Sequence, residues 1–263
     1  MDDIYLIEIR LGRTKWRIRK TIFHFGGLFS LESCIEQHPH VTVFGPLTLN
    51  EGTSPKQLIA TIGKITDGYG PIPFSIDGWE LREGIHGSVI AFPVRPSEPL
   101  KKLTSSLAES LVSLVQSQNI WDARPENKWF HVTVANRLDM HRALAVFSTL
   151  TGRKKTVPDQ GLIQRLKHLI QCMVLWTRGH AVPPLTIDEH GLRLTVMRGD
   201  LIFAEFDLLE NRWISGDYSH KSKSWQNSLC LFRQKFGFEL SDPQPSTPED
   251  IFVIGDLHLG HAN

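Results

Sequence analysis

Hydrophobic and polar residues alternate along several short stretches of the chain, and this period of two predicts β-strands. The sharpest alternation is the tetrapeptide His-Val-Thr-Val, which occupies residues 40–43 and returns letter for letter at residues 131–134. A strand through either copy places His and Thr on one face and the two valines on the other. Further strands are predicted at residues 4–11, 73–81, 86–94, 192–197 and 201–208, with a possible last one at 211–214.

A second period, near 3.6 residues, predicts helices between these strands. The helix at residues 54–66 opens with Ser54, which can cap it, and Pro55, which suits a first turn. A stripe of leucines marks a longer helix at residues 97–118. Other helices are predicted at residues 140–150, 160–176 and 225–236.

The remaining segments are predicted to be loops. The basic segment after Gly12 is interpreted as a loop or a short turn of helix, and the polar residues 122–128 as a loop that leads into the second His-Val-Thr-Val copy. Gly45-Pro46 is predicted to end the first copy's strand, because proline cannot continue a central ladder.

The repeated tetrapeptide suggests a shared binding site. Residues two apart on a strand are separated by roughly 6.6 Å, so an imidazole and a hydroxyl can lean toward one small anion. Two such strands facing each other would offer two titratable groups and two hydroxyls to one phosphate. One His-x-Thr alone is usually an ordinary strand with its polar face in solvent. Its recurrence favours a catalytic site made of His40, Thr42, His131 and Thr133.

Length, charge and cysteine content limit the class of protein but do not identify its function. The 263 residues, 41% of them hydrophobic, can form one large domain or two modest ones. The formal charge of +1 gives no argument for nucleic acid or an anionic membrane from global charge, although local basic runs remain possible contacts. Three separated cysteines argue against a disulfide framework or a zinc cluster. With no signal peptide and no apolar run of membrane-spanning length, we expect a cytoplasmic protein without membrane association.

Two His-x-[Ser/Thr]-apolar motifs about ninety residues apart, the first followed by Phe-Gly-Pro-Leu, resemble the two-histidine (2H) phosphoesterase superfamily. That superfamily includes the RNA 2′,3′-cyclic phosphodiesterases once called 2′-5′ RNA ligases. The resemblance covers roughly residues 1–240. It implies an α+β, bilobal fold in which two antiparallel sheets, related by a pseudo-twofold axis, flank a central cleft with the helices outside.

The resemblance also implies a mechanism without a metal. One histidine takes a proton from the attacking water, the other protonates the departing ribose oxygen, and the threonine hydroxyls hold the non-bridging phosphate oxygens. By analogy with family members that leave a 2′-phosphate, His40 is expected to be the acid and His131 the base. The expected substrates are 2′,3′-cyclic phosphates on RNA ends or nucleotides.

Two more residues are candidates for this site. Family members often carry an arginine shortly after the second motif, and here Asn136 precedes Arg137, so Arg137 is a candidate phosphate ligand or a surface residue. Phe44 shares the alternation of His40 and Thr42 and is therefore a candidate for stacking on a base. The adjacent Phe130 falls on the valine face and is expected in the core.

The end of the chain changes in character. Residues 241–250 form a proline-rich linker, and residues 251–263 read as an apolar strand followed by Asp256, His258 and His261. This pattern resembles the first metal-binding block of calcineurin-like metallophosphoesterases, cut at its start. Carboxylate and imidazole ligands suit Mn, Fe, Ni or Zn, and an intact second domain could remove the phosphate that the first exposes. Alone, these residues are too few for a preorganised site.

The sequence leaves alternatives open. The same acid and base could catalyse the reverse reaction, 2′-5′ RNA ligation, and the chain could instead be a non-catalytic module that binds RNA ends. The physiological RNA or nucleotide, the position of the product phosphate, the oligomeric state and the role of residues 151–180 are not determined by the sequence.

Overall fold

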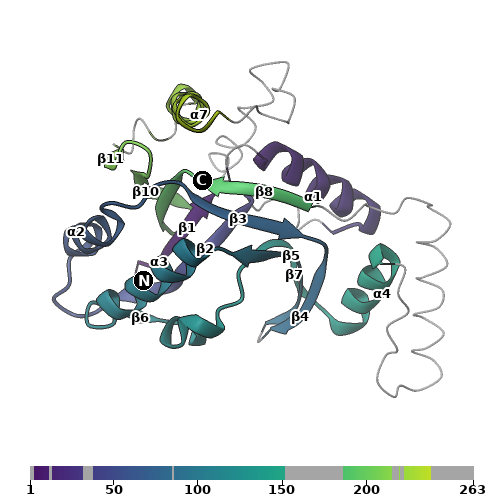
Figure 1. Ribbon diagram of the computed structural model, residues 1–263. Helices are drawn as coiled ribbons and strands as arrows, with labels where there is room; N and C mark the ends of the chain where they lie inside the picture. The colour runs from purple at the N-terminus through teal and green to yellow at the C-terminus, as the bar shows by residue number, and fades with distance from the viewer. Residues whose placement is uncertain are drawn as a thin grey trace, which may run out of the picture.

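The two His-Val-Thr-Val copies lie in two different antiparallel sheets (Figure 1). The first copy begins β2 (His40–Leu49) and the second begins β7 (His131–Leu138). The computed structural model describes residues 3–11, 14–31, 38–84, 86–151, 186–214, 219 and 222–237. It confirms the predicted α+β class, with antiparallel sheets and helices packed outside them.

The first sheet has six strands in the order β11-β10-β9-β1-β2-β6. Its other members are β1 (Tyr5–Arg10), β6 (Val115–Ser117), β9 (Arg193–Arg198), β10 (Leu201–Asp207) and β11 (Arg212–Ile214). Because β6 pairs with β2 only at residues 47–49, the motif half of β2 has β1 as its hydrogen-bonded neighbour among the described strands.

The second sheet has the order β4-β5-β3-β8, and β7 pairs with β5. Its members besides β7 are β3 (Ile72–Asp77), β4 (Glu80–Gly84), β5 (Gly87–Pro96) and β8 (Thr186–Gly191). Among the described strands β7 therefore has one hydrogen-bonded neighbour, as the motif half of β2 does. The two strands lie against each other, which brings the two motifs together.

The helices cover the outer faces of the sheets (Figure 1). They are α1 (Lys15–Phe29), α2 (Pro55–Thr66), α3 (Glu98–Leu111), α4 (Met140–Thr151) and α7 (Ser222–Phe236), with the 3₁₀ turns η2 (Ile120–Ala123) and η3 (Pro125–Asn127). The predicted cap of α2 is confirmed, because the side chain of Ser54 accepts from the N–H of Gln57. Helix α3 packs against β2, β3 and β5, so it joins the two sheets around one core.

Some local predictions were wrong. The basic segment after Gly12 was predicted to be a loop or a short turn of helix, but from Lys15 the chain forms the fifteen-residue helix α1, because Ile18, Ile22 and Phe25 form a buried stripe at helical spacing. The helix beginning at residue 98 ends at 111 and is followed by β6, and β8 was not predicted. The helix predicted at residues 160–176 lies outside the described residues.

Gly45-Pro46 does not end β2, contrary to the prediction. Gly45 has a φ of 99°, which suits glycine, and its N–H donates to Asp122 Oδ2 at 2.7 Å. The carbonyl of Pro46 accepts from the N–H of Gln118 at 2.8 Å. Because neighbouring segments satisfy this backbone, the strand passes through the dipeptide and pairs again with β1 at Leu47.

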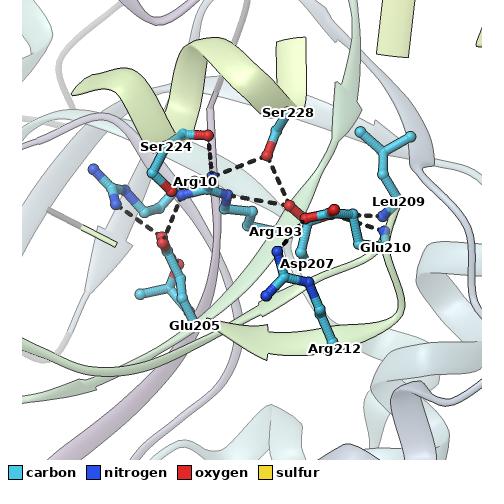
Figure 2. A network of polar contacts seen from close by, with 10 residues as sticks. Arg10, Arg193, Glu205, Asp207, Leu209, Glu210, Arg212, Ser224 and Ser228 are labelled. Atoms are coloured by element: carbon cyan, nitrogen blue, oxygen red, sulfur yellow. Dashed lines mark hydrogen bonds and ion pairs between the residues drawn. The ribbon is translucent and has the colours of Figure 1, made fainter. Parts of the chain in front are cut away.

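A buried polar network attaches α7 to the first sheet (Figure 2). Arg193, which is 1% exposed, donates to Glu205 at 2.9 Å and to the hydroxyls of Ser224 and Ser228, both at 2.9 Å. The other oxygen of Glu205 accepts from Arg10 at 2.8 Å. Since Arg10 pairs in register with His40, the network extends from the last described helix to the first motif. None of the described helices is both long and apolar enough to cross a bilayer.

Candidate active site

The four motif residues alternate with buried valines, as predicted. His40, Thr42, His131 and Thr133 are partly exposed, whereas Val41, Val43 and Val132 are 0% exposed and Val134 is 1% exposed. The valines belong to the common core, so each strand is held from behind while its polar face remains accessible.

Each motif contains a bulge at the same place, its final valine. On β2, Thr42 and Phe44 pair with consecutive residues of β1, so Val43 is the additional residue. On β7, Thr133 and Ala135 likewise pair with consecutive residues of β5, and Val134 is additional. The two copies therefore share a backbone irregularity as well as a sequence, because in each sheet the additional residue follows the Thr directly.

These bulges change what the alternation predicted for two residues. Phe44 is 3% exposed within the core, because the bulge turns its side chain to the face of Val43, so the ring offers no free face for a base. Arg137 is exposed, has a φ of 55° and lies at a second irregularity of β7, where residues 135 and 138 pair with residues two apart on β5. Phe130 is in the core at 4% exposure, as predicted.

Both histidine rings are fixed through the same nitrogen. His40 Nδ1 lies 2.9 Å from the carbonyl oxygen of His38, and His131 Nδ1 lies 3.0 Å from that of Trp129. A carbonyl oxygen only accepts, so Nδ1 carries a hydrogen in each ring. Nε2 then remains to take or give a proton, which is the arrangement that acid and base catalysis needs.

A buried carboxylate stands beside His40. Glu8, 0% exposed, lies on β1 opposite Thr42; its Oε1 is 2.7 Å from His38 Nε2, and its Oε2 is 3.7 Å from His40 Nδ1. Burial raises the pKa of Glu8, but the neighbouring His40 and His38 and the charge of Arg10 outweigh it, so the pKa is lowered. Burial lowers the pKa of His38, with the bond to Glu8 opposing.

A tryptophan and an arginine stand beside His131. The rings of Trp129 and His131 stack with centroids 3.7 Å apart at 15°, and the guanidinium of Arg82 lies 4.5 Å from the centre of the indole. Glu80 accepts from Trp129 Nε1 at 2.9 Å and from Arg82 Nε at 2.7 Å. Burial lowers the pKa of His131 to about 4, with the charges of His40 and Arg82 adding and the Trp129 carbonyl and Glu80 opposing.

The two rings act on each other. The charge of His40 contributes to the low pKa of His131, so the two imidazoles lie within electrostatic reach across the contact of β2 and β7. The sequence did not identify Glu8, Glu80, Arg82 or His38 as parts of the site. One available signal was an aromatic ring two residues before each motif histidine, His38 and Trp129.

The sequence and the described part of the structure each offer one group of candidate metal ligands. Asp256, His258 and His261 lie outside the described residues. Ligand atoms of Glu8, His38 and His40 lie within 4.8 Å of one another. His38 Nε2 and Glu8 Oε1 are bonded to each other, however, and His40 Nδ1 faces a carbonyl oxygen, so this cluster fits a hydrogen-bonded network better than a metal centre.

A family model described as the 2′-5′ RNA ligase superfamily matches residues 35–179, which is more than half of the chain and contains both motifs. No curated protein matches the chain.

Three solved structures are similar at low identity. A protein described as a phosphoesterase has 13% identity and a TM-score of 0.41, over 81% of this chain and 94% of that one. The Thermus thermophilus protein TT0787 has 12% identity and a TM-score of 0.42, over 78% of this chain and 97% of that one. E. coli LigT, complexed with 3′-AMP, has 12% identity and a TM-score of 0.36, over 81% of this chain and 93% of that one.

Proposed function

Because the chain belongs to the 2′-5′ RNA ligase superfamily, we propose that it is a phosphodiesterase that opens 2′,3′-cyclic phosphates on RNA ends or nucleotides. The observation that supports this proposal is the pair of matched half-sites. In each, a histidine fixed through Nδ1 and a threonine two residues later share the accessible face of a strand, and the two strands adjoin.

The proposed reaction uses His131 as the base and His40 as the acid. Nε2 of neutral His131 takes a proton from water as the water oxygen bonds to phosphorus. The bond from phosphorus to one ribose oxygen breaks, and protonated His40 gives its proton to that oxygen. The low pKa of His131 supports its role, since a base must be unprotonated when substrate binds.

The threonines are proposed to stabilise the charge that develops on phosphate. Thr42 and Thr133 follow the histidines on the same accessible faces, and each hydroxyl can donate to a non-bridging oxygen. These four side chains supply proton transfer and charge stabilisation, so we propose turnover without a metal ion.

The decisive assay follows hydrolysis of an oligonucleotide ending in a 2′,3′-cyclic phosphate, in EDTA, with the position of the product phosphate resolved. We expect chelator-insensitive turnover, and a loss of roughly a hundred- to ten-thousandfold in His40→Ala and in His131→Ala. His24→Ala is the matched control, because His24 is exposed on α1. Activity that survives both active-site replacements, or is abolished by EDTA, would overturn the proposal.

The family description favours one alternative, 2′-5′ ligation, in which the same acid and base open the cyclic phosphate with a 5′-hydroxyl in place of water. Incubation of the cyclic-phosphate oligonucleotide with an acceptor bearing a free 5′-hydroxyl distinguishes the two, because ligation gives a longer product. A module that only binds RNA ends would instead bind tightly without turnover, and its binding would be unaffected by His131→Ala.

A further inference from the structure

The two half-sites repeat one more feature, the aromatic ring two residues before each catalytic histidine. In both, the carbonyl of that residue accepts from Nδ1, and its own ring lies against the histidine. The rings of His38 and His40 are 4.7 Å apart at 36°, and those of Trp129 and His131 are 3.7 Å apart at 15°. The geometry of the two halves is thus similar.

The charges behind these rings are opposite. In the first half the buried carboxylate of Glu8 bonds to His38 and reaches to 3.7 Å from His40. In the second half the guanidinium of Arg82 covers the indole of Trp129 at 4.5 Å. An anion therefore stands behind one histidine and a cation behind the other.

We propose that these opposite charges assign the catalytic roles: Glu8 keeps His40 as the proton donor, and the Arg82–Trp129 pair keeps His131 as the proton acceptor. The inference rests on the proposed function, whose chemistry needs one histidine in each state. Glu8, Arg82 and Trp129 are positioning residues here, since they act through the histidines.

The hydrogen bonding in the first half leaves the charge of Glu8 available to His40. Only Oε1 is bonded, to His38, while Oε2 is buried and has no hydrogen-bond donor among the described residues. A buried carboxylate oxygen without a donor favours a neighbouring cation, and His40 Nδ1 lies 3.7 Å from this oxygen. The other charges acting on Glu8 include Arg10, which is engaged by Glu205, and Lys15 of α1, whose pKa is lowered to about 7 mainly by burial.

In the second half-site, the surroundings of His131 favour the neutral form of its imidazole. Trp129 covers one face of His131 and shields it from water, and Arg82 places a positive charge behind that cover. Glu80 holds both parts, with one oxygen on the indole N–H and the other on the guanidinium, and offsets part of the charge of Arg82. The charged and titratable groups acting on His131 are therefore His40, Arg82 and Glu80.

The first test needs no substrate. Histidine-labelled protein is titrated by NMR, and the His131 resonance is followed in the unaltered protein and in variants. In Trp129→Leu and in Arg82→Gln, protonation of His131 should move to higher pH by roughly 0.5 to 1 unit. Glu80→Gln should move it to lower pH, because glutamine can keep the bond to the indole N–H without the negative charge. Arg82→Lys should restore most of the original behaviour, and Arg95→Gln, an exposed arginine on β5, should change nothing.

The second test is the pH profile of kcat/KM. Arg82→Gln should move the acidic limb to higher pH by the amount seen by NMR, because the base must be neutral. Glu8→Gln should lower kcat/KM and leave the acidic limb in place, because Glu8 acts on the acid His40 and not on the base. An acidic limb that stays in place in Arg82→Gln, or that moves in Glu8→Gln, would overturn the assignment.

The two experiments separate the two proposals. If His131 responds by NMR but no cyclic phosphate is hydrolysed, the proposed function fails and the role assignment fails with it, although the electrostatic effect stands. If turnover is observed but neither the resonance nor the acidic limb responds, the function is supported and the charge assignment is wrong.

Discussion

Lys128 and Asp122 form a buried ion pair, with Nζ 2.6 Å from Oδ1 and both side chains 2% exposed. Asp122 Oδ2 accepts from the N–H of Gly45 at 2.7 Å and from the hydroxyl of Ser117 at 2.6 Å. Gly45 lies two residues after Val43, the additional residue of the first bulge, and Lys128 lies three residues before His131. One carboxylate therefore connects the end of the first motif to the approach of the second.

Replacing Asp122 should be more harmful than replacing Lys128. Asp122→Ala leaves a buried ammonium and the N–H of Gly45 without their acceptor, and we expect a loss of about 3–5 kcal/mol in the free energy of unfolding. Lys128→Met leaves Asp122 with two donors, so its cost should be smaller. Urea unfolding measures both. The exposed pair Lys101–Glu98 provides the control, because Lys101→Met should cost no more than about 0.5 kcal/mol. Equal losses in the two buried variants would contradict the connecting role of Asp122.

Loss of one motif hydroxyl should slow the reaction without unfolding the protein. Thr42→Val and Thr133→Val keep the shape of the side chain but remove the donor to phosphate, and we expect kcat to fall by roughly a hundred- to a thousandfold in each. Steady-state kinetics on the cyclic-phosphate oligonucleotide measures this. Thr→Ser at the same positions should retain most activity, and Thr48→Val, further along β2, should be neutral. Unchanged kcat in both valine variants would remove the threonines from the mechanism.

The sequence predicted the part of the site that depends on alternation. A repeated tetrapeptide fixes which face carries His40 and which carries Val41, because strand geometry allows no other arrangement. Helix α3 was predicted for the same reason, from leucines at helical spacing. The full length of α1 was not predicted, because basic residues interrupt the apolar pattern that Ile18, Ile22 and Phe25 form on its buried side.

The remainder of the site depends on contacts between distant segments. Glu8 reaches His38 across thirty residues because β1 pairs with β2 in one particular register, and no local pattern contains that register. Arg82 reaches Trp129 because β5 pairs with both β4 and β7. No local sequence pattern predicts these pairings. Phe44 was predicted on the accessible face, but the bulge at Val43 reverses the alternation and turns Phe44 into the core. Valine and phenylalanine are not residues from which a bulge can be predicted.

His131 should make stability depend on pH. The pKa of its ring is about 4 in the folded protein and 6.5 as the ordinary value, so the unfolded chain binds a proton more readily. Its contribution is complete above about pH 6.5 and is lost as the pH falls toward 4, with a slope of at most about 1.4 kcal/mol per pH unit. Urea unfolding between about pH 7 and about pH 4.5 should show a smaller slope in His131→Phe than in the unaltered protein. The exposed His24→Phe should leave the slope unchanged, and identical slopes in all three proteins would contradict the low pKa.

Gly87 should be required for the pairing that presents the second motif. Its φ is 114°, and an added Cβ would lie 2.9 Å from the carbonyl oxygen of Leu138 and 3.1 Å from Cα of Arg137, so both the conformation and the space favour glycine. We expect Gly87→Ala to lower the free energy of unfolding by roughly 1–3 kcal/mol. It should also lower kcat below the melting temperature, because β5 holds β7 in register. Gly70→Ala is the matched control, since nothing lies within 4 Å of the added Cβ, and its stability should change by no more than about 0.5 kcal/mol. If thermal unfolding and turnover were the same for both alanine variants, the close contact of Gly87 with the end of β7 would not position His131.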